Sequence, residues 1–332
     1  MGNNTLKLSQ ACEGMLRYKA ATGKSPHTIV DYRSSFKKLQ LYFSSDPPFA
    51  SITRAQLIAF FAWLQDEYVS EPDGAAPRGK AKLSAKTVFN IHTNLSLLWS
   101  WAVNEELVPK NIIRTIDPPP VSDLVIETFT KDEISALLKA CDVTHTWKNR
   151  AATTNVRSTA FRDRAIILTL LDTGCRASEL CGICVGDLNL NTNSIKIHGK
   201  GPGRDGKERI VYLGKRTSQA IWKCLLPRLN SSKEDDRLFV VGPDSDLRPM
   251  TRDVLRKLLH RIVERAGMAN VYPHRFRHTF AITYLRNEGD ILTLQALLGH
   301  SDLEMVKRYA RIAQTDCAEA HRRASPVDNW KL

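Results

Sequence analysis

The chain has 332 residues, 42% of them hydrophobic, which is enough for two folded domains and speaks against a largely disordered protein. Its formal net charge of +13 favours a polyanionic partner, of which nucleic acid is the commonest. No apolar run approaches the ~18 residues that a membrane-spanning helix requires, and the start of the chain lacks the apolar region of a secretory signal.

The seven cysteines are scattered and odd in number, which favours reduced thiols, so we expect a cytoplasmic protein. Cys181 and Cys184 form a C-x-x-C pair, but no second pair follows at zinc spacing, and we expect no metal site. The two thiols are better explained as small hydrophobic side chains at a helix end.

Residues 1–116 have a helical pattern without any strand signal. Ser25 and Pro26 are a typical cap and first turn, and apolar residues recur after them at helical spacing. Further helices are expected from Thr53 and from Ser84, with a loop from Glu71 to Lys82 between them. The sequence therefore predicts a small bundle of four or five helices as the first domain.

A proline-rich stretch, "IDPPPVSDL", separates this region from the rest, because three consecutive prolines end a helix and favour an extended spacer. We expect a linker over residues 117–125 and a second domain over residues 126–332. Residues 1–117 hold 14 lysines and arginines against 10 acidic residues, so they carry +4 of the net charge and the remainder carries +9. The excess positive charge is thus shared by both predicted domains.

The second domain is expected to be mainly helical with one β-hairpin. Thr130 and Glu133 form a capping box, a polar loop runs over 142–156, and Gly174 ends a helix. "SIKIHGK" and "ERIVYLG" alternate with period two around a glycine-rich tip, which predicts a hairpin. Later helices are expected from about Thr217, Thr251, His274 and Asp290, and over residues 301–323. The fold class is mainly α with a small β-hairpin or sheet (α+β).

Several polar residues of the second domain stand at positions that favour anion binding. Arg176 begins a helix, where free amide groups and the guanidinium together attract an anion; a solvated arginine is the alternative. His274 and Arg277 are three apart and share a helix face, which suits a phosphate, whereas His278 is expected to fall away from that face.

His300 lies in a turn between helices, between Gly299 and the candidate cap Ser301, and a structural role fits it as well. Lys200 lies between glycines in the hairpin loop, where it is also explained as an ordinary loop lysine. Tyr309 stands in the basic stretch "MVKRYARI".

Five stretches in this order, "TGCRASEL", "IHGKG", "PHRFRHTF", "LLGHS" and "MVKRYARI", resemble the catalytic domain of tyrosine site-specific recombinases, the phage-integrase and Xer-type family. The resemblance covers about Thr130 to Arg311, and the helical first domain with its linker is similar to the family's core-binding domain. It implies a two-domain DNA clamp.

The resemblance also implies roles for individual residues. Tyr309 corresponds to the nucleophile, and Glu179 to the acidic residue that supports the first arginine. The loop lysine is Lys200, with Lys207 as the alternative because this loop is longer than the family's usual form. The other implied catalytic residues are Arg176, His274, Arg277 and His300. Lys82 and Lys86 are candidate phosphate contacts of the first domain, or solvated residues near a helix start.

These residue types suit phosphoryl transfer on a DNA phosphodiester. Two arginines neutralise the charge of the non-bridging oxygens, and a tyrosine stores the bond energy in a phosphotyrosine. A phenol has an ordinary pKa of about 10, so nearby positive charge helps to form the phenolate, and His274 is the expected proton acceptor. A lysine of the hairpin loop is expected to protonate the leaving 5′-oxygen, and we expect neither a metal nor another cofactor.

The implied function is site-specific recombination through a 3′-phosphotyrosine and a Holliday junction, either for integration and excision of a mobile element or for resolution of DNA dimers. The expected partner is double-stranded DNA with a specific recombination site, bound by a homotetramer in which the C-terminal segment, with Trp330, docks on a neighbour or on its own domain. The alternatives are a type IB topoisomerase-like enzyme and a catalytically silent DNA-binding protein.

Overall fold

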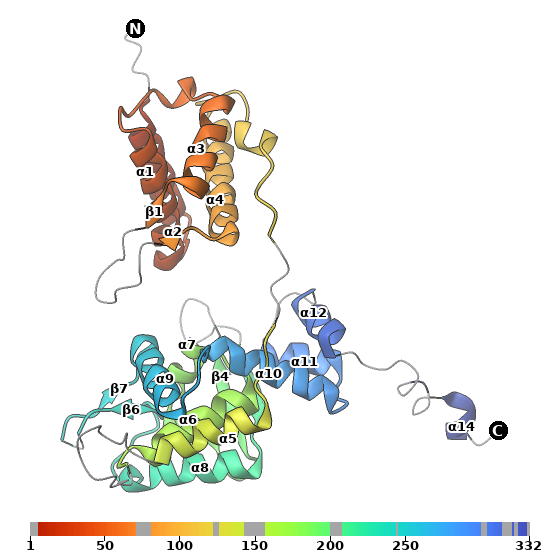
Figure 1. The fold of residues 1–332 in the computed structure, drawn as a ribbon. Helices are drawn as coiled ribbons and strands as arrows, with labels where there is room; N and C mark the ends of the chain where they lie inside the picture. Colours follow the sequence, from red (N-terminus) through yellow and green to blue (C-terminus); the bar gives the residue numbers. More distant parts are fainter. Residues whose placement is uncertain are drawn as a thin grey trace. The chain divides into compact units, whose positions relative to one another are not determined.

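The computed structural model describes residues 6–70, 81–121, 126–142, 157–199, 208–243, 245–299, 304–313, 321 and 325–330. The chain divides into two compact units, Met1–Leu124 and Val125–Leu332 (Figure 1). The predicted linker bounds, 117–125, stay a prediction. Among the described helices, none has both the length and the hydropathy needed to cross a membrane.

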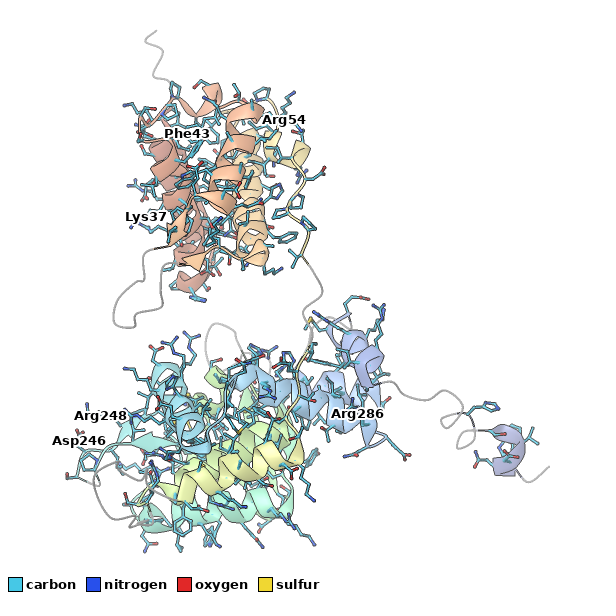
Figure 2. The ribbon with its side chains drawn as sticks, in the orientation of Figure 1. Lys37, Phe43, Arg54, Asp246, Arg248 and Arg286 are labelled. Carbon is cyan, nitrogen blue, oxygen red and sulfur yellow. The ribbon has the colours of Figure 1, made fainter. Side chains whose placement is uncertain are left out.

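The first unit is a bundle of helices around one core, as predicted. Leu57, Phe60 and Trp99 are almost fully buried there. The predicted caps are present: the hydroxyl oxygens of Ser25 and Ser84 accept hydrogen bonds from the amides three residues later, each at 3.2 Å. The helices are α1 (Leu8–Ala21), α2 (Pro26–Tyr42), η1 (Phe49–Ser51), α3 (Arg54–Asp66), α4 (Ala85–Asn104) and η2 (Ile112–Thr115). Arg54, labelled in Figure 2, ties α3 to η2 through a 3.1 Å hydrogen bond from Nη2 to the Thr115 carbonyl.

The expectation that the first domain contains no strand was wrong. Two short strands, β1 (Val69–Ser70) and β2 (Ala81–Lys82), pair in antiparallel register, so the predicted loop stops before Ala81. A pairing of two residues per strand is too short to produce a period-two sequence pattern, which is why it escaped prediction. Residues 71–80 lie outside the described part of the chain.

The second unit combines helices with a small antiparallel sheet, in the order β3-β4-β5. The predicted hairpin is confirmed by the pairing of β4 with β5, in which Ile197 is opposite Arg209. Strand β3 was not predicted. The strands are β3 (Leu188–Asn189), β4 (Ser194–His198), β5 (Glu208–Tyr212) and a separate pair, β6 (Val240–Val241) and β7 (Arg248–Pro249). The fold is therefore mainly α with small sheets.

The helices of the second unit pack into two hydrophobic cores, and most of their predicted starting points are confirmed within one or two residues. Gly174 ends α6 in the left-handed conformation, with φ 58°. The predicted loop over 142–156 falls, from residue 143 onward, outside the described residues. The helices are α5 (Lys131–Asp142), α6 (Ala160–Thr173), α7 (Ala177–Gly182), η3 (Val185–Asp187), α8 (Lys215–Leu225), η4 (Leu226–Arg228), α9 (Arg252–Ala266), α10 (Pro273–Arg286), α11 (Ile291–Leu298), α12 (Glu304–Ala313) and α14 (Pro326–Trp330).

The smaller of these two cores joins α10, α11 and α12. Buried aliphatic side chains from all three helices meet there, among them Ile282, Leu294 and Val306, each 0% exposed. The larger core joins the sheet to α5, α6, α8 and α9, and Phe276 of α10 contributes to it. Helix α10 therefore contacts both cores, which gives the polar side chains along it fixed positions.

Candidate active site

Arg176 is the N-cap residue of α7, close to the predicted helix start, and its side chain is held by the carboxylate of Glu179, one turn later. The Arg176 amide donates to Glu179 Oε2 and the guanidinium Nη1 donates to Oε1, both at 2.8 Å. The Arg176 side chain remains 34% exposed while that of Glu179 is 5% exposed. Glu179 thus orients the arginine from the protein side and leaves the guanidinium accessible to an anion.

Glu179 has a second partner, Arg209 of β5, that the sequence analysis did not single out. Arg209 donates from Nη1 to Oε1 at 3.2 Å and from Nη2 to Oε2 at 2.8 Å. Burial alone would raise the pKa of Glu179, but the hydrogen bonds and charges of Arg209 and Arg176 lower it to about 2. The carboxylate is therefore ionised at neutral pH and shared by two guanidinium groups.

Arg277 is the most deeply buried arginine of this group, with 2% of its surface exposed. Its Nη1 donates to the Gly174 carbonyl and its Nη2 to the Leu298 carbonyl, both at 2.8 Å. These carbonyls belong to the C-terminal ends of α6 and α11, which lack intrahelical partners and carry partial negative charge. Burial and the nearby charge of Arg176 lower the pKa of Arg277 to about 10, which still leaves it charged at neutral pH.

His274 stands in the first turn of α10, with an exposed side chain. Partial desolvation and the positive charges of Arg277 and Arg176 lower its pKa, so the neutral imidazole predominates at neutral pH. His274 and Arg176 also line a pocket of about 340 Å³, together with Arg252 and Tyr272. The predicted pair His274 and Arg277 is thus close to Arg176.

Tyr309 lies on α12 and is 1% exposed. Its hydroxyl is 2.9 Å from Nδ1 of His278. Desolvation raises the pKa of the phenol, and the positive charges of Arg277, Arg308 and Arg176 oppose that rise. The tyrosine is therefore within electrostatic reach of both predicted phosphate-binding arginines of its own chain, and it is protonated and covered in this conformation.

The expectation that His278 falls away from the face of His274 was wrong. Residues four apart are neighbours on a helix surface, just as residues three apart are, and the two imidazole rings stack with centroids 6.1 Å apart. Burial, with the charges of His274, Arg277 and Arg308, lowers the pKa of His278 to about 4. The spacing to His274 was the signal that could have identified this residue.

Lys200, its alternative Lys207 and His300 lie outside the described residues. The structure fixes only their neighbours along the chain: β4 ends at His198, β5 begins at Glu208, and α11 ends at Leu298.

Of the two candidate DNA contacts in the first unit, Lys82 is in β2 rather than in a loop, and Lys86 is in the first turn of α4 with Nζ 4.6 Å from the centre of the Phe89 ring. Both lysines are exposed. Among the described residues, no three His, Cys, Asp or Glu side chains are grouped to hold a metal ion.

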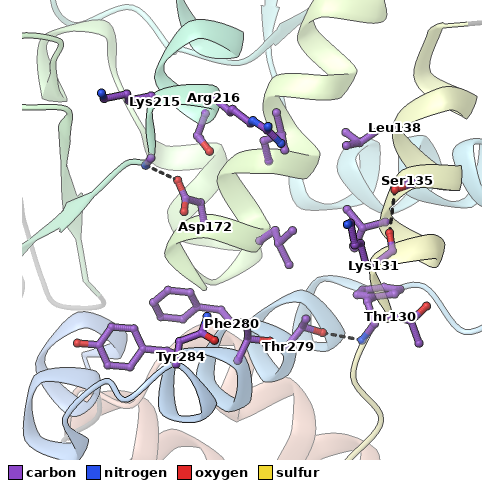
Figure 3. Close-up of a pocket in the computed structure, with 18 residues that line it drawn as sticks. Thr130, Lys131, Ser135, Leu138, Asp172, Lys215, Arg216, Thr279, Phe280 and Tyr284 are labelled. Atoms are coloured by element: carbon purple, nitrogen blue, oxygen red, sulfur yellow. Dashed lines mark hydrogen bonds between the residues drawn. The ribbon is translucent and has the colours of Figure 1, made fainter.

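A larger pocket, of about 720 Å³, lies elsewhere on the second unit and contains none of the predicted catalytic residues. It is lined by α5, α6 and α10 and by the start of α8 (Figure 3). Asp172 accepts a 2.7 Å hydrogen bond from the Gly214 amide at its wall, and Phe280 and Tyr284 cover another side. The predicted catalytic residues Arg176 and His274 line the smaller pocket instead.

Comparisons with known proteins find relatives along most of the chain. Residues 127–316 match the phage integrase family, and residues 10–116 match the phage integrase SAM-like domain. The chain is 30% identical over 325 residues to a tyrosine recombinase XerC of Staphylococcus saprophyticus, covering 96% of this chain and 97% of that protein. It is 27% identical over 305 residues to a tyrosine recombinase XerD of Staphylococcus haemolyticus, covering 92% and 94%.

Solved structures show the same fold. The Tn1549 transposon integrase in complex with a circular intermediate DNA matches with a TM-score of 0.73 at 18% identity, covering 96% of this chain and 99% of that one. The XerH site-specific recombinase bound to its palindromic difH substrate matches with a TM-score of 0.67 at 21% identity, covering 98% and 85%. The two family matches together span most of the sequence. The chain therefore belongs to the phage integrase family, the tyrosine recombinases, which are enzymes that break and rejoin DNA.

Proposed function

We propose that this tyrosine recombinase cleaves double-stranded DNA at a specific recombination site by attack of the Tyr309 hydroxyl on the scissile phosphate. The observation that carries the proposal is that Tyr309 lies beside His278 on α10, within reach of the charges of Arg176 and Arg277. In the proposed reaction, the two arginines that bind the phosphate belong to the same protomer as the tyrosine. Cleavage is thus expected in cis, with each protomer using its own tyrosine.

In the proposed step the Tyr309 oxygen bonds to phosphorus as the bond from phosphorus to the 5′-oxygen breaks. The phenol proton passes to His274, whose lowered pKa leaves it neutral and able to accept. The products are a 3′-phosphotyrosine and a free 5′-hydroxyl, whose proton comes from Lys200 or from the alternative, Lys207. The reverse reaction, with the 5′-hydroxyl of a partner strand as nucleophile, rejoins the DNA without an external energy source.

The arginines supply the electrostatic part of catalysis. Arg176 and Arg277 bind the non-bridging oxygens and stabilise the charge that develops in the transition state, while Glu179 orients Arg176 and His300 donates a hydrogen bond to the phosphate. Arginine forks match the geometry of phosphate oxygens, so this role needs no metal ion. We therefore expect cleavage to continue in EDTA.

Tyr309 and Arg277 both require a change of conformation before they meet the phosphate, because their side chains are only 1% and 2% exposed. We propose that DNA binding uncovers the hydroxyl, which breaks the hydrogen bond to His278. The reaction is then confined to DNA-bound protein, in the cytoplasm.

The assembled enzyme is proposed to be a homotetramer that recombines two sites through a Holliday junction, for integration and excision of a mobile element or for resolution of DNA dimers. One similar structure, with a TM-score of 0.67 at 16% identity, is a lambda integrase tetramer bound to a Holliday junction. In this chain Val327 and Trp330 of α14 are exposed apolar residues, available to dock on a neighbouring protomer. Both units are proposed to contact DNA, the first through Lys82 and Lys86.

A suicide DNA substrate that carries a nick near the cleavage point tests the chemistry. The wild-type protein is expected to form a covalent protein–DNA adduct, and Tyr309→Phe to form none. An adduct that persists in Tyr309→Phe contradicts the assignment of the nucleophile. Relaxation of a supercoiled plasmid without a recombination site would support a topoisomerase instead. DNA binding without any covalent adduct would support a catalytically silent DNA-binding protein.

A further inference from the structure

Arg209 connects three parts of the second unit through one guanidinium group. Its side chain is 10% exposed, and it points from β5 toward the active site rather than into solvent. Nη1 and Nη2 bind the two oxygens of Glu179, and Nε donates to the Leu297 carbonyl at 2.7 Å. All three nitrogen atoms therefore have acceptors, and the fork geometry that this needs is available only to arginine.

The first consequence concerns the charge of Arg176. The Glu179 carboxylate is buried, ionised and bonded to both Arg176 and Arg209. One negative charge is thus shared between two positive charges, so the group keeps a net positive charge. Without Arg209 the buried carboxylate would be compensated by Arg176 alone, and Arg176 would offer less charge to a phosphate.

The second consequence concerns the end of α11. The Leu297 carbonyl is held by Arg209 and the next one, of Leu298, by Arg277. Gly299 follows with φ 62°, and a Cβ there would lie 3.0 Å from Nη1 of Arg209. Two arginines and a glycine therefore fix the helix end from which the chain leads directly to His300.

The third consequence concerns the hairpin. Arg209 is two residues after Lys207, and its partner in β4, Ile197, is three residues before Lys200. Because Arg209 ties β5 to both Glu179 and α11, the base of the hairpin has a fixed position relative to Arg176. Both candidate lysines are therefore within two residues of a strand of this hairpin, whose base Arg209 fixes in position.

We infer that Arg209 is a positioning residue for DNA cleavage, which neutralises Glu179 so that Arg176 keeps its charge for the phosphate and fixes the helix end that leads to His300. The inference rests on the proposed function, since it assigns Arg209 a part in the same phosphoryl transfer. Arg209 acts through Glu179 and Leu297 and does not itself contact the reacting atoms.

Single-turnover cleavage of the suicide substrate at saturating DNA tests this role with two substrates. One carries the ordinary scissile phosphodiester and the other an uncharged methylphosphonate at the same position. Arg209→Gln is expected to slow cleavage of the phosphodiester by about 10- to 100-fold. An effect of this size is typical when a residue that orients a catalytic group through hydrogen bonds is removed. The methylphosphonate is expected to be slowed less, because it needs less positive charge.

Three further variants separate charge from packing. Arg209→Lys keeps the charge but loses the fork, so its rate is expected to lie between those of the wild type and Arg209→Gln. Arg209→Gln combined with Glu179→Gln is expected to cleave faster than Arg209→Gln alone, because Arg176 is released from a buried carboxylate. Arg286→Gln, in the exposed last turn of α10, is the matched control and is expected to cleave at the wild-type rate.

Equal slowing of both substrates in Arg209→Gln overturns the inference, because a purely structural defect does not depend on the charge of the phosphate. A wild-type rate in Arg209→Gln overturns it as well. If Arg209→Gln unfolds at the assay temperature, the same comparison of two substrates is made with Arg209→Lys. Tyr309→Phe is assayed in parallel, and a covalent adduct in that variant contradicts the proposed function. If Tyr309→Phe forms no adduct but the Arg209 variants cleave at the wild-type rate, only the role of Arg209 is contradicted.

Discussion

The hydroxyl of Tyr309 and Nδ1 of His278 lie 2.9 Å apart, and both groups are in their neutral forms at neutral pH. Burial raises the pKa of the phenol and, with the neighbouring positive charges, lowers that of the imidazole to about 4. The phenol donates this hydrogen bond when the imidazole proton is on Nε2. The contact therefore stabilises Tyr309, the proposed nucleophile, in a protonated and covered form.

Acid is expected to destabilise the second unit through His278. In the unfolded chain this imidazole has its ordinary pKa of 6.5, whereas in the folded protein the pKa is about 4. Between these values the unfolded state binds a proton that the folded state does not, so the free energy of unfolding decreases as the pH falls. At pH 5 the expected loss is up to about 2 kcal/mol.

Urea unfolding at pH 7 and at pH 5 measures this effect. His278→Asn keeps an acceptor for the phenol and does not titrate, so it should lose less stability between the two pH values than the wild type. Some pH dependence should remain, because the pKa of His274 is lowered as well. An identical pH dependence in the wild type and in His278→Asn would contradict the assignment.

Removal of Arg275 is expected to destabilise the fold without altering the chemistry. This buried side chain of α10 donates from Nη2 to Glu133 Oε1 at 2.9 Å and to the Thr128 carbonyl at 3.1 Å, and it lies over the Phe129 ring. Arg275→Ala should cost about 3 kcal/mol of unfolding free energy, because it breaks a largely buried ion pair. Arg286→Ala, in the same helix but exposed, should change stability by less than about 0.5 kcal/mol.

The same two variants separate stability from catalysis. Below its melting temperature Arg275→Ala should form the covalent adduct at a rate close to that of the wild type. A large loss of cleavage by a folded Arg275→Ala protein would place this residue in the reaction rather than in the packing of α5 on α10.

A side chain at Gly174 is expected to disturb both packing and the active site. Its φ of 58° disfavours other residues, and a Cβ would lie 2.5 Å from Cδ1 of Phe280. Gly174→Ala should lose about 1–3 kcal/mol of stability and slow cleavage, because the Gly174 carbonyl binds Arg277. Gly182→Ala is the control, since a Cβ there meets nothing within 4 Å. Thermal melting and adduct formation measure the two effects, and a Gly174→Ala protein as stable and active as Gly182→Ala would refute them.

The lysines of the first unit are expected to contribute to DNA affinity through charge. If Lys82 and Lys86 each bind a phosphate, each substitution by alanine lowers affinity for any sequence and reduces the salt slope of the logarithm of the binding constant by about 1. Titrations at several salt concentrations measure the slope. Lys24→Ala is the control, because Lys24 is an exposed lysine just after α1. If the Lys82→Ala and Lys86→Ala proteins have the same salt slope as this control, neither lysine contacts a DNA phosphate.

Local signals predicted much of the fold. The caps at Ser25 and Ser84 depend on a side chain and an amide within three residues, so the sequence contains all the information they need. The hairpin and the left-handed end of α6 at Gly174 depend on equally local patterns. The two-residue strands β1 and β3 were missed because nothing in so short a stretch distinguishes a strand from a loop.

Active-site contacts were predictable only where spacing along one element decides them. Arg209 was missed because Glu179 is 30 residues before it and Leu297 88 residues after it, and no local pattern links them. The structure shows which face of β5 is buried: Arg209 shares its face with the buried Val211, while Ile210 and Tyr212 are exposed on the other face. A strand that turns an arginine inward and an isoleucine outward indicates a buried partner for the arginine.

Arg277 has one further consequence, for the handedness of the reaction. Its guanidinium is bonded to the ends of α6 and α11, so in the proposed reaction it would approach the phosphate from one fixed direction. The two non-bridging oxygens of a scissile phosphate are prochiral, and a rigid donor does not treat them alike. We expect the enzyme to cleave one phosphorothioate diastereomer of its DNA site faster than the other, so that two helix ends determine the stereochemical preference at phosphorus.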